Sequence, residues 1–401
     1  MERQLNDQQL ARRDKMNKLI EMGINPFGNA YKRTHLTKQI IDSYQHLDKE
    51  QLEQENIAVK VAGRIMFKRR MGKLGFMQIQ DKSGMIQIVV NKGVVGDDVY
   101  EIFKLNDVGD FVGIEGTIMK TDTGELSVRT VVYTHITKSL TPLPEKFHGL
   151  TNVEERYRRR YVDLFMNEDS KRIAFLRPTI IKTIRNYMDS LGFTEVETPV
   201  LTTLLTGASA RPFVTHHNTQ DLDMYLRIAL ELPLKRLLVG GMEAVYEIGR
   251  TFRNEGMSPM HNPEFTLMEA YLAYSDLEGM MDLTEGMFTE IAKVVGKDTF
   301  NFNGHEITIK APFRKISMVE AIKEKTGIDF KEEISFQQAV VYAKEANIEV
   351  EPHFSIGHII NAFFEKYVEE DLIQPTFLYG HPVEISPLTR AKQQDPRFVE
   401  R

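Results

Sequence analysis

The chain has 401 residues, 42% of them apolar, which is enough for two or three domains that each bury a core. It carries 51 Lys and Arg against 57 Asp and Glu, a formal charge of −6, so a nucleic acid could be bound only at a local basic patch. The absence of cysteine excludes disulfides, thiolate zinc sites and a cysteine nucleophile. The polar N-terminus and the lack of a long apolar run predict a soluble, cytoplasmic protein that does not contact a membrane.

The first part of the chain, residues 1–58, is expected to be a helical N-terminal extension. Residues 4–22 have the apolar spacing of an amphipathic helix, and Gly23 and Pro26 follow as stop signals. This extension is predicted to precede the first domain.

Residues 59–140 change to short alternating runs separated by glycine and Asp-Lys-Ser-Gly turns. The runs are "VKVAGRIMF", "GFMQIQ", "MIQIVV", "FVGIEGTIM" and "LSVRTVVYT". Five short strands with a helical stretch near residues 99–105 predict a small closed β-barrel of the oligonucleotide-binding kind, the OB-fold. A β-sandwich is the alternative.

The first of these strands carries a basic run with no acidic residue among residues 59–73. Its members are Lys60, Arg64, Lys68, Arg69, Arg70 and Lys73. In a net-negative chain such a run is a candidate phosphate-binding patch, and Phe76 offers a ring on which a base could stack. The alternatives are a solvated loop for the charges and a core position for Phe76.

Residues 141–170 read as a linker, with two prolines in "SLTPLPEKFHGL" and then the arginine-rich helix "VEERYRRRYVDLF". A long helix is expected to run to Gly192, and "FTEVETPVL" is expected to be a strand that stops at Pro199. A helix over residues 230–241 precedes two β-like segments at 244–255 and 264–274. Residues 276–370 are mostly helical in pattern, with a hairpin near "FNFNGHEITIK".

The two β-like segments carry the chemistry. Residues two apart share a face of a strand, and the loop 256–262 lets the chain return as an antiparallel partner. The hairpin would then present a guanidinium, carboxylates and aromatic rings together, which suits a nucleotide bound flat on a sheet. The residues are Arg253, Glu255, Phe265, Glu269 and Tyr271. The alternative is a solvated hairpin with surface ion pairs.

Several segments resemble one family of enzymes. "FRNEG" followed by "HNPEF" resembles motif 2 of the class II aminoacyl-tRNA synthetases, and "GFTEVETPVL" resembles their motif 1. More narrowly, "GASARPFVTHHN", "DLDMYLRIALELPLKRLLVGG" and "EIGRTFRNEG" resemble the lysyl-tRNA synthetases, and the similarity runs nearly end to end. The resemblance implies an α+β fold: an OB-fold anticodon-binding domain over residues 59–140, then an antiparallel-sheet catalytic domain over 171–401 with a helical insertion at about 276–370.

The resemblance also implies roles for individual residues. Arg253 would bind the ATP α-phosphate and the amino-acid carboxylate, and Phe265 would stack on the adenine. Glu255 and Asn262 would hold the adenine edge and His261 the terminal phosphates. Gly207 and Glu269 would receive the α-amino group. Glu231 and Tyr271 would receive the lysine ε-ammonium, which needs a carboxylate because a buried unpaired charge is costly; the alternative for Glu231 is an exposed helical glutamate. In the barrel, Lys68, Arg69, Arg70, Phe76, Gln87 and Glu125 would contact tRNA.

Other phosphate and metal signals are absent or weak. No G-x-x-x-x-G-K-[ST] or G-x-G-x-x-G sequence occurs, so nucleotide binding must depend on the hairpin. His305 lacks the second histidine of a zinc-protease helix, and His216 and His217 are adjacent, so all three are predicted to be structural or surface residues. No metal ligand is predicted within the 401 residues.

The chain departs from the family pattern in one large and several small ways. Gly380 is the last glycine, so the glycine-rich third motif, with its γ-phosphate arginine and the Mg²⁺ carboxylates upstream of it, is expected to be missing. Thr206, Leu230, Pro233 and Met260 stand where the family usually has other residues, and their effect on substrate binding is left open.

Two functions follow as expectations. The first is a lysine–tRNA ligase that uses ATP and Mg²⁺, charges tRNA(Lys) with L-lysine and forms a homodimer through motif 1; the 401-residue polypeptide itself is expected to be weak or inactive. The alternative is a truncated, non-catalytic relative of the synthetases that binds tRNA or dimerises.

Overall fold

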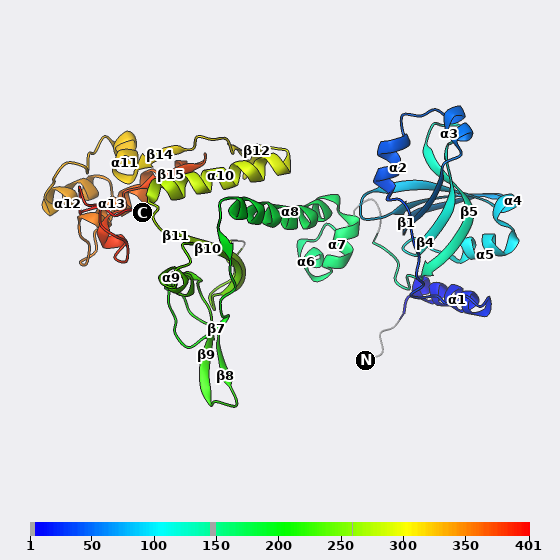
Figure 1. Ribbon diagram of the computed structural model, residues 1–401, viewed down its shortest axis with the longest axis horizontal. Coiled ribbons are helices and arrows are strands. Elements are labelled where there is room, and N and C mark those ends of the chain that lie inside the picture. The colour runs from blue at the N-terminus through cyan, green and yellow to red at the C-terminus, as the bar shows by residue number, and fades with distance from the viewer. Residues whose placement is uncertain (1–4, 145–149, 259) are drawn as a thin grey trace. The chain divides into compact units, whose positions relative to one another are not determined.

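The computed structural model describes residues 5–144, 150–258 and 260–401 (Figure 1). The chain divides into two compact units, Met1–Glu168 and Asp169–Arg401, and each unit has its own hydrophobic core. Residues 145–149 of the predicted linker and Pro259 of the predicted hairpin loop lie outside the described residues.

The N-terminal unit begins with three helices: α1 (Asp7–Glu21), α2 (Thr37–Tyr44) and α3 (Lys49–Glu55). The side chain of Asn6 accepts from the backbone N–H of Gln9 and the Gln9 side chain accepts from Asn6, a capping box that fixes the start of α1. The helix predicted near residues 4–22 is therefore confirmed, with Gly23 just beyond its end.

Five strands then close into a barrel, which confirms the predicted architecture and rejects the sandwich. They are β1 (Ala58–Met71), β2 (Leu74–Gln80), β3 (Met85–Asn91), β4 (Phe111–Lys120) and β5 (Leu126–Thr137), in the order β1-β2-β3-β5-β4. The pairs are antiparallel except β3 and β5. Inward side chains such as Ile65, Met77 and Ile114 are completely buried, because every second residue of each strand faces the barrel interior.

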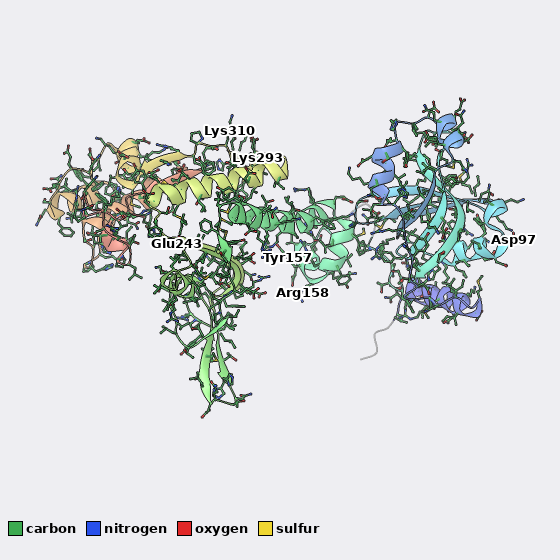
Figure 2. All side chains as sticks on the ribbon, viewed as in Figure 1. Asp97, Tyr157, Arg158, Glu243, Lys293 and Lys310 are labelled. Carbon is green, nitrogen blue, oxygen red and sulfur yellow. The ribbon has the colours of Figure 1, made fainter. Side chains whose placement is uncertain are left out.

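Two helices, α4 (Lys92–Val95) and α5 (Asp97–Leu105), connect β3 to β4. Asp97 stands in the first turn of α5 (Figure 2), where a carboxylate faces the positive end of the helix dipole. Phe103 of α5 is completely buried in the barrel core.

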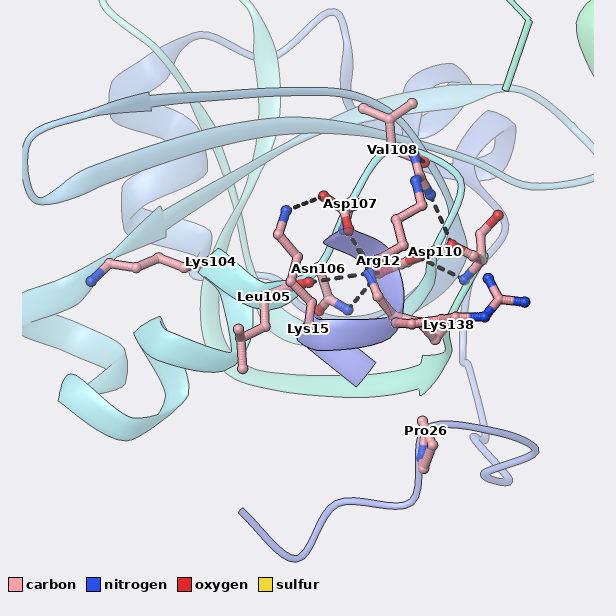
Figure 3. A network of polar contacts seen from close by, with 12 residues as sticks. Arg12, Lys15, Pro26, Lys104, Leu105, Asn106, Asp107, Val108, Asp110 and Lys138 are labelled. Atoms are coloured by element: carbon pink, nitrogen blue, oxygen red, sulfur yellow. Dashed lines mark hydrogen bonds and ion pairs between the residues drawn. The ribbon is translucent and has the colours of Figure 1, made fainter. Parts of the chain in front are cut away.

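A buried polar network ties α1 to the end of the barrel (Figure 3). The ammonium of Lys138 lies 2.7 Å from carboxylate oxygens of both Asp107 and Asp110, and its side chain is fully buried. From α1, Arg12 donates to the backbone carbonyls of Ser139 and Val108 at 2.8 and 2.9 Å, and Lys15 pairs with Asp107 at 2.5 Å. Every charge in this cluster has a partner of opposite sign or a carbonyl, as burial requires.

The arginine-rich segment forms two short helices, α6 (Val153–Arg158) and α7 (Arg160–Met166), so the prediction of one continuous helix is wrong. The break lies at Arg159, whose backbone leaves the helical region at φ −117° and ψ 46°. Both helices then contribute to one buried carboxylate, because Arg156 and Arg160 each pair with Asp163. Tyr157 and Arg158 project from α6 as exposed side chains (Figure 2).

The second unit starts with the long helix α8 (Glu168–Ser190), which ends two residues before Gly192 as expected. Its central sheet has the order β11-β10-β6, in which β10 (Ala244–Phe252) pairs antiparallel with β11 (Glu264–Leu272) and parallel with β6 (Thr194–Glu195). The predicted strand over residues 193–199 is therefore wrong beyond Glu195. Thr198 is engaged instead with the carboxylate of Glu247, and Pro199 has no N–H for a ladder.

A second, three-stranded sheet has the order β7-β9-β8, built from β7 (Leu201–Thr202), β8 (Val214–His217) and β9 (Leu222–Leu226). Helix α9 (Glu231–Val239) follows it, and its buried Leu234 packs with Val245 of β10. This packing holds the first turn of α9 against the central sheet.

The remainder is mostly helical. Helix α10 (Leu277–Val295) leads to the hairpin β12 (Thr299–Phe302) and β13 (His305–Thr308), which confirms the predicted hairpin. The elements that follow share a separate hydrophobic core. They are β14 (Arg314–Ser317), α11 (Met318–Thr326), α12 (Phe336–Glu345), α13 (Ile356–Tyr367) and β15 (Thr376–Tyr379), with short 3-10 turns η1 (Glu369–Asp371) and η2 (Val383–Ile385). Across the described residues, no helix combines the length and apolar character that crossing a membrane needs.

Candidate active site and nucleic-acid-binding surface

Arg253 does not lie in a strand, because β10 ends at Phe252. The expectation that Arg253 and Glu255 share a strand face is therefore wrong. After Phe252 the backbone is held by hydrogen bonds outside the strand ladder. The Arg253 N–H donates to the carbonyl of Pro263 at 2.8 Å, and the Glu255 N–H donates to the carbonyl of Arg253 at 2.9 Å.

The structure nevertheless brings Arg253 to Phe265. The guanidinium carbon lies 5.2 Å from the centre of the Phe265 ring, within the range of a cation–π contact. The Nε of Arg253 is buried and has no hydrogen-bond partner among the described residues. A buried donor without a partner is rare, so this atom fits a site where a phosphate or carboxylate oxygen binds.

The other residues predicted to bind ATP lie around the loop. Glu255 accepts a hydrogen bond from the backbone N–H of Arg211 at 3.2 Å, while the N–H of Asn254 donates to the carbonyl of Arg211 at 2.8 Å, so the segment before β8 is held against the hairpin. His261 contacts Ser258 at 2.8 Å and is exposed, as is Asn262. The contacts among the described residues do not join His261 or Asn262 to Arg253.

The residues predicted to bind the amino acid are brought together. Gly207 has φ +86°, and a Cβ there would lie 2.8 Å from the Cβ of Ala229 and 3.1 Å from that of Glu231. Only glycine fits this backbone against the start of α9 without strain. Gly207 and Glu231 are therefore direct neighbours.

Glu269 joins α9 to β11. Its carboxylate accepts the N–H of Leu230 at 3.0 Å and the hydroxyl of Tyr271 at 2.9 Å. Burial and the carboxylates of Glu269 and Glu231 raise the pKa of Tyr271 far above its ordinary value, so the phenol stays protonated and remains a donor. Gly207, Glu231, Glu269 and Tyr271 therefore form one cluster, the Gly207 cluster, which holds two carboxylates and one hydroxyl.

Lys235 is a member of this group that sequence reasoning missed. Its ammonium pairs with the carboxylate of Glu231, one helical turn earlier, and lies 5.9 Å from the centre of the Tyr271 ring. A glutamate and a lysine four residues apart on a predicted helix are a recognisable signal for such a pair.

A buried ion pair behind the pocket was also missed. Arg227 and Glu247 join β9 to β10, and Thr198 donates its hydroxyl to the same carboxylate at 2.6 Å. Beside it is a cavity of about 470 Å³, whose lining includes Thr206 and Pro233. Of the other two departures from the family pattern, Leu230 is fully buried and Met260 is exposed.

On the barrel, several residues predicted to bind tRNA share an outer surface. Arg69 of β1 stands opposite Phe76 of β2, and Gln78 of β2 stands opposite Gln87 of β3. Gln87 donates its amide to Ser127 of β5 at 2.9 Å. Arg69 is exposed and Phe76 is partly exposed, while the next residue, Met77, is buried. Phe76 is therefore not a core residue. Arg70 and Glu125 are exposed near the strand ends.

Lys68 does not belong to the exposed basic surface. Its ammonium turns the other way, donates to the backbone carbonyls of Phe103, Lys104 and Asn106 at the end of α5, and lies 4.3 Å from the Phe103 ring. Burial lowers the pKa of Lys68 to about 7. The physical reason is register: Lys68 stands opposite the buried Met77.

Two further members of the basic run are also engaged. Lys60 pairs with Glu115 at 2.7 Å, and the guanidinium of Arg64 lies 4.4 and 4.2 Å from the ring centres of Phe111 and Phe165. Of the basic run, Lys60, Arg69, Arg70 and Lys73 are exposed, whereas Lys68 is turned inward, and binding of phosphate by the exposed members stays a prediction.

His216, His217 and His305 are exposed, as expected. His216 contacts Asp223 and Asp221 at 2.9 and 3.2 Å, and His217 and His305 lie on exposed strands. Within the described ranges, no group of three or more His, Cys, Asp or Glu side chains could hold a metal ion. These residues do not form a site that fits Mg²⁺, so no side chain among them is assigned to it.

Comparison with known proteins agrees with this arrangement. Residues 152–401 match the family model for class II tRNA synthetases (D, K and N), and residues 59–134 match the model for the OB-fold nucleic acid binding domain. The chain is 56% identical to the lysine–tRNA ligases of Lactococcus lactis subsp. cremoris and of Streptococcus sanguinis, over 99% of this chain and 81% of each relative. It is 53% identical to the lysine–tRNA ligase of Bacillus subtilis, over 99% of this chain and 80% of that protein.

The matches confirm both parts of the predicted fold, an OB-fold barrel and a class II catalytic domain. The barrel match falls on the five strands. The catalytic match contains the β10–β11 hairpin with Arg253 and the cluster of Gly207, Glu231, Glu269 and Tyr271. The chain belongs to the lysine–tRNA ligases, within the class II aminoacyl-tRNA synthetases.

Proposed function

We propose that the chain binds ATP and L-lysine on the hairpin side of β11, joins them as lysyl-adenylate and transfers the lysyl group to tRNA(Lys). The observation that carries the proposal is the layout of β11. Phe265 lies under the Arg253 guanidinium, and Glu269 belongs to the Gly207 cluster. The two residues are four apart in β11 and so lie on one face of the strand.

The reaction requires charge stabilisation at one phosphate. A carboxylate oxygen of lysine attacks the α-phosphorus of ATP, a new P–O bond forms, and the bond to the bridging oxygen of the leaving pyrophosphate breaks. Negative charge gathers on the α-phosphate oxygens in this step. Arg253, with its unpaired buried Nε, would face that charge and hold the attacking carboxylate beside it.

The remaining groups would orient the two substrates. Phe265 would stack on the adenine, with Glu255 and Asn262 at its edge and His261 near the terminal phosphates. Gly207 and Glu269 would receive the α-amino group. Glu231 and the protonated Tyr271 would receive the ε-ammonium, whose burial is affordable only beside a carboxylate. Class II synthetases use Mg²⁺ with ATP; it would help to neutralise the phosphates, and no described residue is given that role.

We further propose that the barrel binds the tRNA anticodon and that α8 with the segment after it forms a homodimer interface in a cytoplasmic enzyme. The outward Phe76 and the exposed Arg69, Arg70 and Lys73 support the first part, since a stacking ring beside cations suits single-stranded RNA. Exposed apolar side chains on α8, Ile173 and Phe175, support the second.

The test is lysine-dependent exchange of pyrophosphate into ATP, with Arg253→Ala as the control. If the original chain catalyses exchange and Arg253→Ala lowers the rate at least a hundredfold, the proposed role of Arg253 is supported. The same assay measures the activity of the 401-residue polypeptide.

If exchange is too slow to detect, equilibrium binding of amino acids tests the proposed lysine pocket instead. The chain is expected to bind L-lysine in preference to L-leucine, and Glu231→Gln is expected to remove that preference. Binding of lysine no tighter than leucine would contradict the proposed pocket. Salt-sensitive tRNA binding without lysine binding would instead favour the non-catalytic alternative.

A further inference from the structure

A lysine of the chain itself pairs with the carboxylate that is proposed to receive the substrate's ε-ammonium. The Nζ of Lys235 pairs with Oε1 of Glu231, and the same Nζ lies 5.9 Å from the centre of the Tyr271 ring. Glu231 and Tyr271 are the two residues proposed to receive the lysine side chain. One internal ammonium therefore pairs with the first of these residues and lies near the ring of the second.

The fold holds Lys235 in this place. Glu231 and Lys235 are four residues apart on α9, so they lie on the same face of the helix. The buried Leu230 and Leu234 pack with Val245 and Tyr271 and fix the rotation of α9 over the central sheet. The lysine that follows Leu234 is thereby directed to the rim of the pocket.

One oxygen of the Glu231 carboxylate is already engaged. Its Oε1 is engaged by Lys235, and its Oε2 lies on the side of Gly207, 3.3 Å from where a Cβ on that glycine would be. The hydroxyl of Tyr271 already donates to Glu269. A substrate ammonium that approaches Glu231 would meet Lys235 as a like charge in direct contact with the same carboxylate.

When Lys235 leaves Glu231 it loses that ion pair but does not become buried without a partner. Its side chain is 53% exposed, compared with 35% for Glu231, so rotation carries the ammonium into water rather than into the protein. Exchange of one ammonium for another keeps the charge of the pocket constant.

We propose that Lys235 is a placeholder cation that pairs with Glu231 until the ε-ammonium of the substrate lysine displaces it, and that this competition lowers the affinity for lysine. The inference rests on the proposed function of the pocket. It adds a residue that touches neither ATP nor the reacting carboxylate and acts on affinity by occupying the substrate's ion-pair partner. A ligand without a side-chain cation leaves the Lys235–Glu231 pair in place and gains nothing from Glu231.

The test compares L-lysine with L-norleucine, which has the same chain length but no ε-ammonium, by isothermal titration calorimetry on the 401-residue chain. Lys235→Met is expected to bind lysine about tenfold more tightly, equivalent to about 1.4 kcal/mol, and to bind norleucine within twofold of the original chain. Lys235→Gln, also neutral, is expected to behave in the same way, whereas Lys235→Arg keeps the cation and is expected to keep the original affinity.

Two controls separate this inference from the proposed function. Arg236→Met removes a positive charge from the next position of α9, which lines the cavity of Thr206 rather than the Glu231 pair, and is expected to leave lysine affinity within twofold. Glu231→Gln is expected to abolish the preference for lysine over norleucine. Unchanged or weaker lysine binding by both neutral variants, while Glu231→Gln still loses the preference, would overturn the placeholder and leave the pocket standing. No preference for lysine in the original chain would overturn the pocket and the placeholder with it.

Discussion

The guanidinium of Arg227 donates to the carboxylate of Glu247 at 2.6 Å, and both side chains are less than 10% exposed. The same guanidinium donates to the carbonyls of Thr198 and Arg250 at 3.0 and 2.8 Å, and Glu247 also accepts the Thr198 hydroxyl. The pair thus fastens the segment after β6 and strand β9 to β10, on which the Arg253 hairpin is built. It is a structural support for the site.

Glu247→Ala is expected to destabilise the second unit by about 3–5 kcal/mol, because it leaves the Arg227 guanidinium buried without its carboxylate. The measurement is urea unfolding of the whole chain followed by circular dichroism. Glu243→Ala, an exposed glutamate just before β10, is the matched control and is expected to change stability by at most about 0.5 kcal/mol. Equal effects of the two variants would show that the buried pair does not support the unit.

The second prediction concerns the nucleotide. Phe265→Leu is expected to weaken ATP binding about tenfold, because stacking of a base on an aromatic ring contributes about 1–3 kcal/mol. Lysine affinity is expected to stay within twofold, since the proposed lysine pocket uses Glu231, Glu269 and Tyr271. Calorimetric titration with each ligand measures both effects. Phe302→Leu, at an exposed position of β12, is the control for loss of a ring elsewhere. A parallel loss of lysine affinity would mean that Phe265 shapes the whole pocket rather than the adenine subsite.

Much of the fold can be predicted from the sequence, because the signals are local. Alternating runs between glycine turns predict the barrel, and two alternating segments around a polar loop predict the β10–β11 hairpin. The errors arise where distant contacts override local pattern. Residues 196–199 are predicted to continue the strand, yet Thr198 bonds to Glu247, a residue 49 positions away.

In the candidate site too, local signals could be predicted from the sequence and distant contacts could not. Arg253, Phe265 and Glu269 could be proposed from the motif that resembles the family, whereas the Arg227–Glu247 pair joins the end of β9 to β10 of a different sheet, which no local pattern indicates. Lys68 is the clearest misreading. A basic run suggests a solvated face, but strand alternation turns Lys68 inward, and its ammonium is satisfied by carbonyls at the end of α5.

Because Lys68 is turned inward and its neighbour Arg69 is exposed, the two residues are expected to affect tRNA binding differently. Arg69→Ala is expected to weaken binding and to make its dependence on salt shallower by about 0.7–0.9 in the slope of log K against log[salt], because one phosphate contact is lost. Lys68→Met is expected to leave that slope unchanged, since its ammonium contacts backbone carbonyls inside the barrel. Fluorescence anisotropy of labelled tRNA at several salt concentrations measures both slopes, and circular dichroism verifies that each variant is folded. A shallower slope for Lys68→Met would place its charge on the RNA and contradict the assignment.

The buried position of Lys68 also predicts how stability depends on pH. Burial lowers its pKa from 10.5 to about 7 in the native state, with nearby Asp107 opposing the change, whereas the unfolded chain keeps the ordinary value. Between about pH 7 and pH 9.5 the unfolded state therefore binds the proton that the native state has released, so the free energy of unfolding rises with pH, by at most about 1.4 kcal/mol per unit from this group. Lys68→Met removes this dependence.

The measurement is urea unfolding of the original chain and of Lys68→Met at pH 7.0, 8.0 and 9.0, all below the ordinary pKa of tyrosine. The stability of the original chain relative to the variant is expected to increase at each step. Lys82→Met, an exposed lysine between β2 and β3, is the control and is expected to show a constant difference from the original chain. A constant difference for Lys68→Met as well would mean that the carbonyls at the end of α5 keep the ammonium charged in the native barrel, and that Lys68 caps this helix as a cation throughout the range.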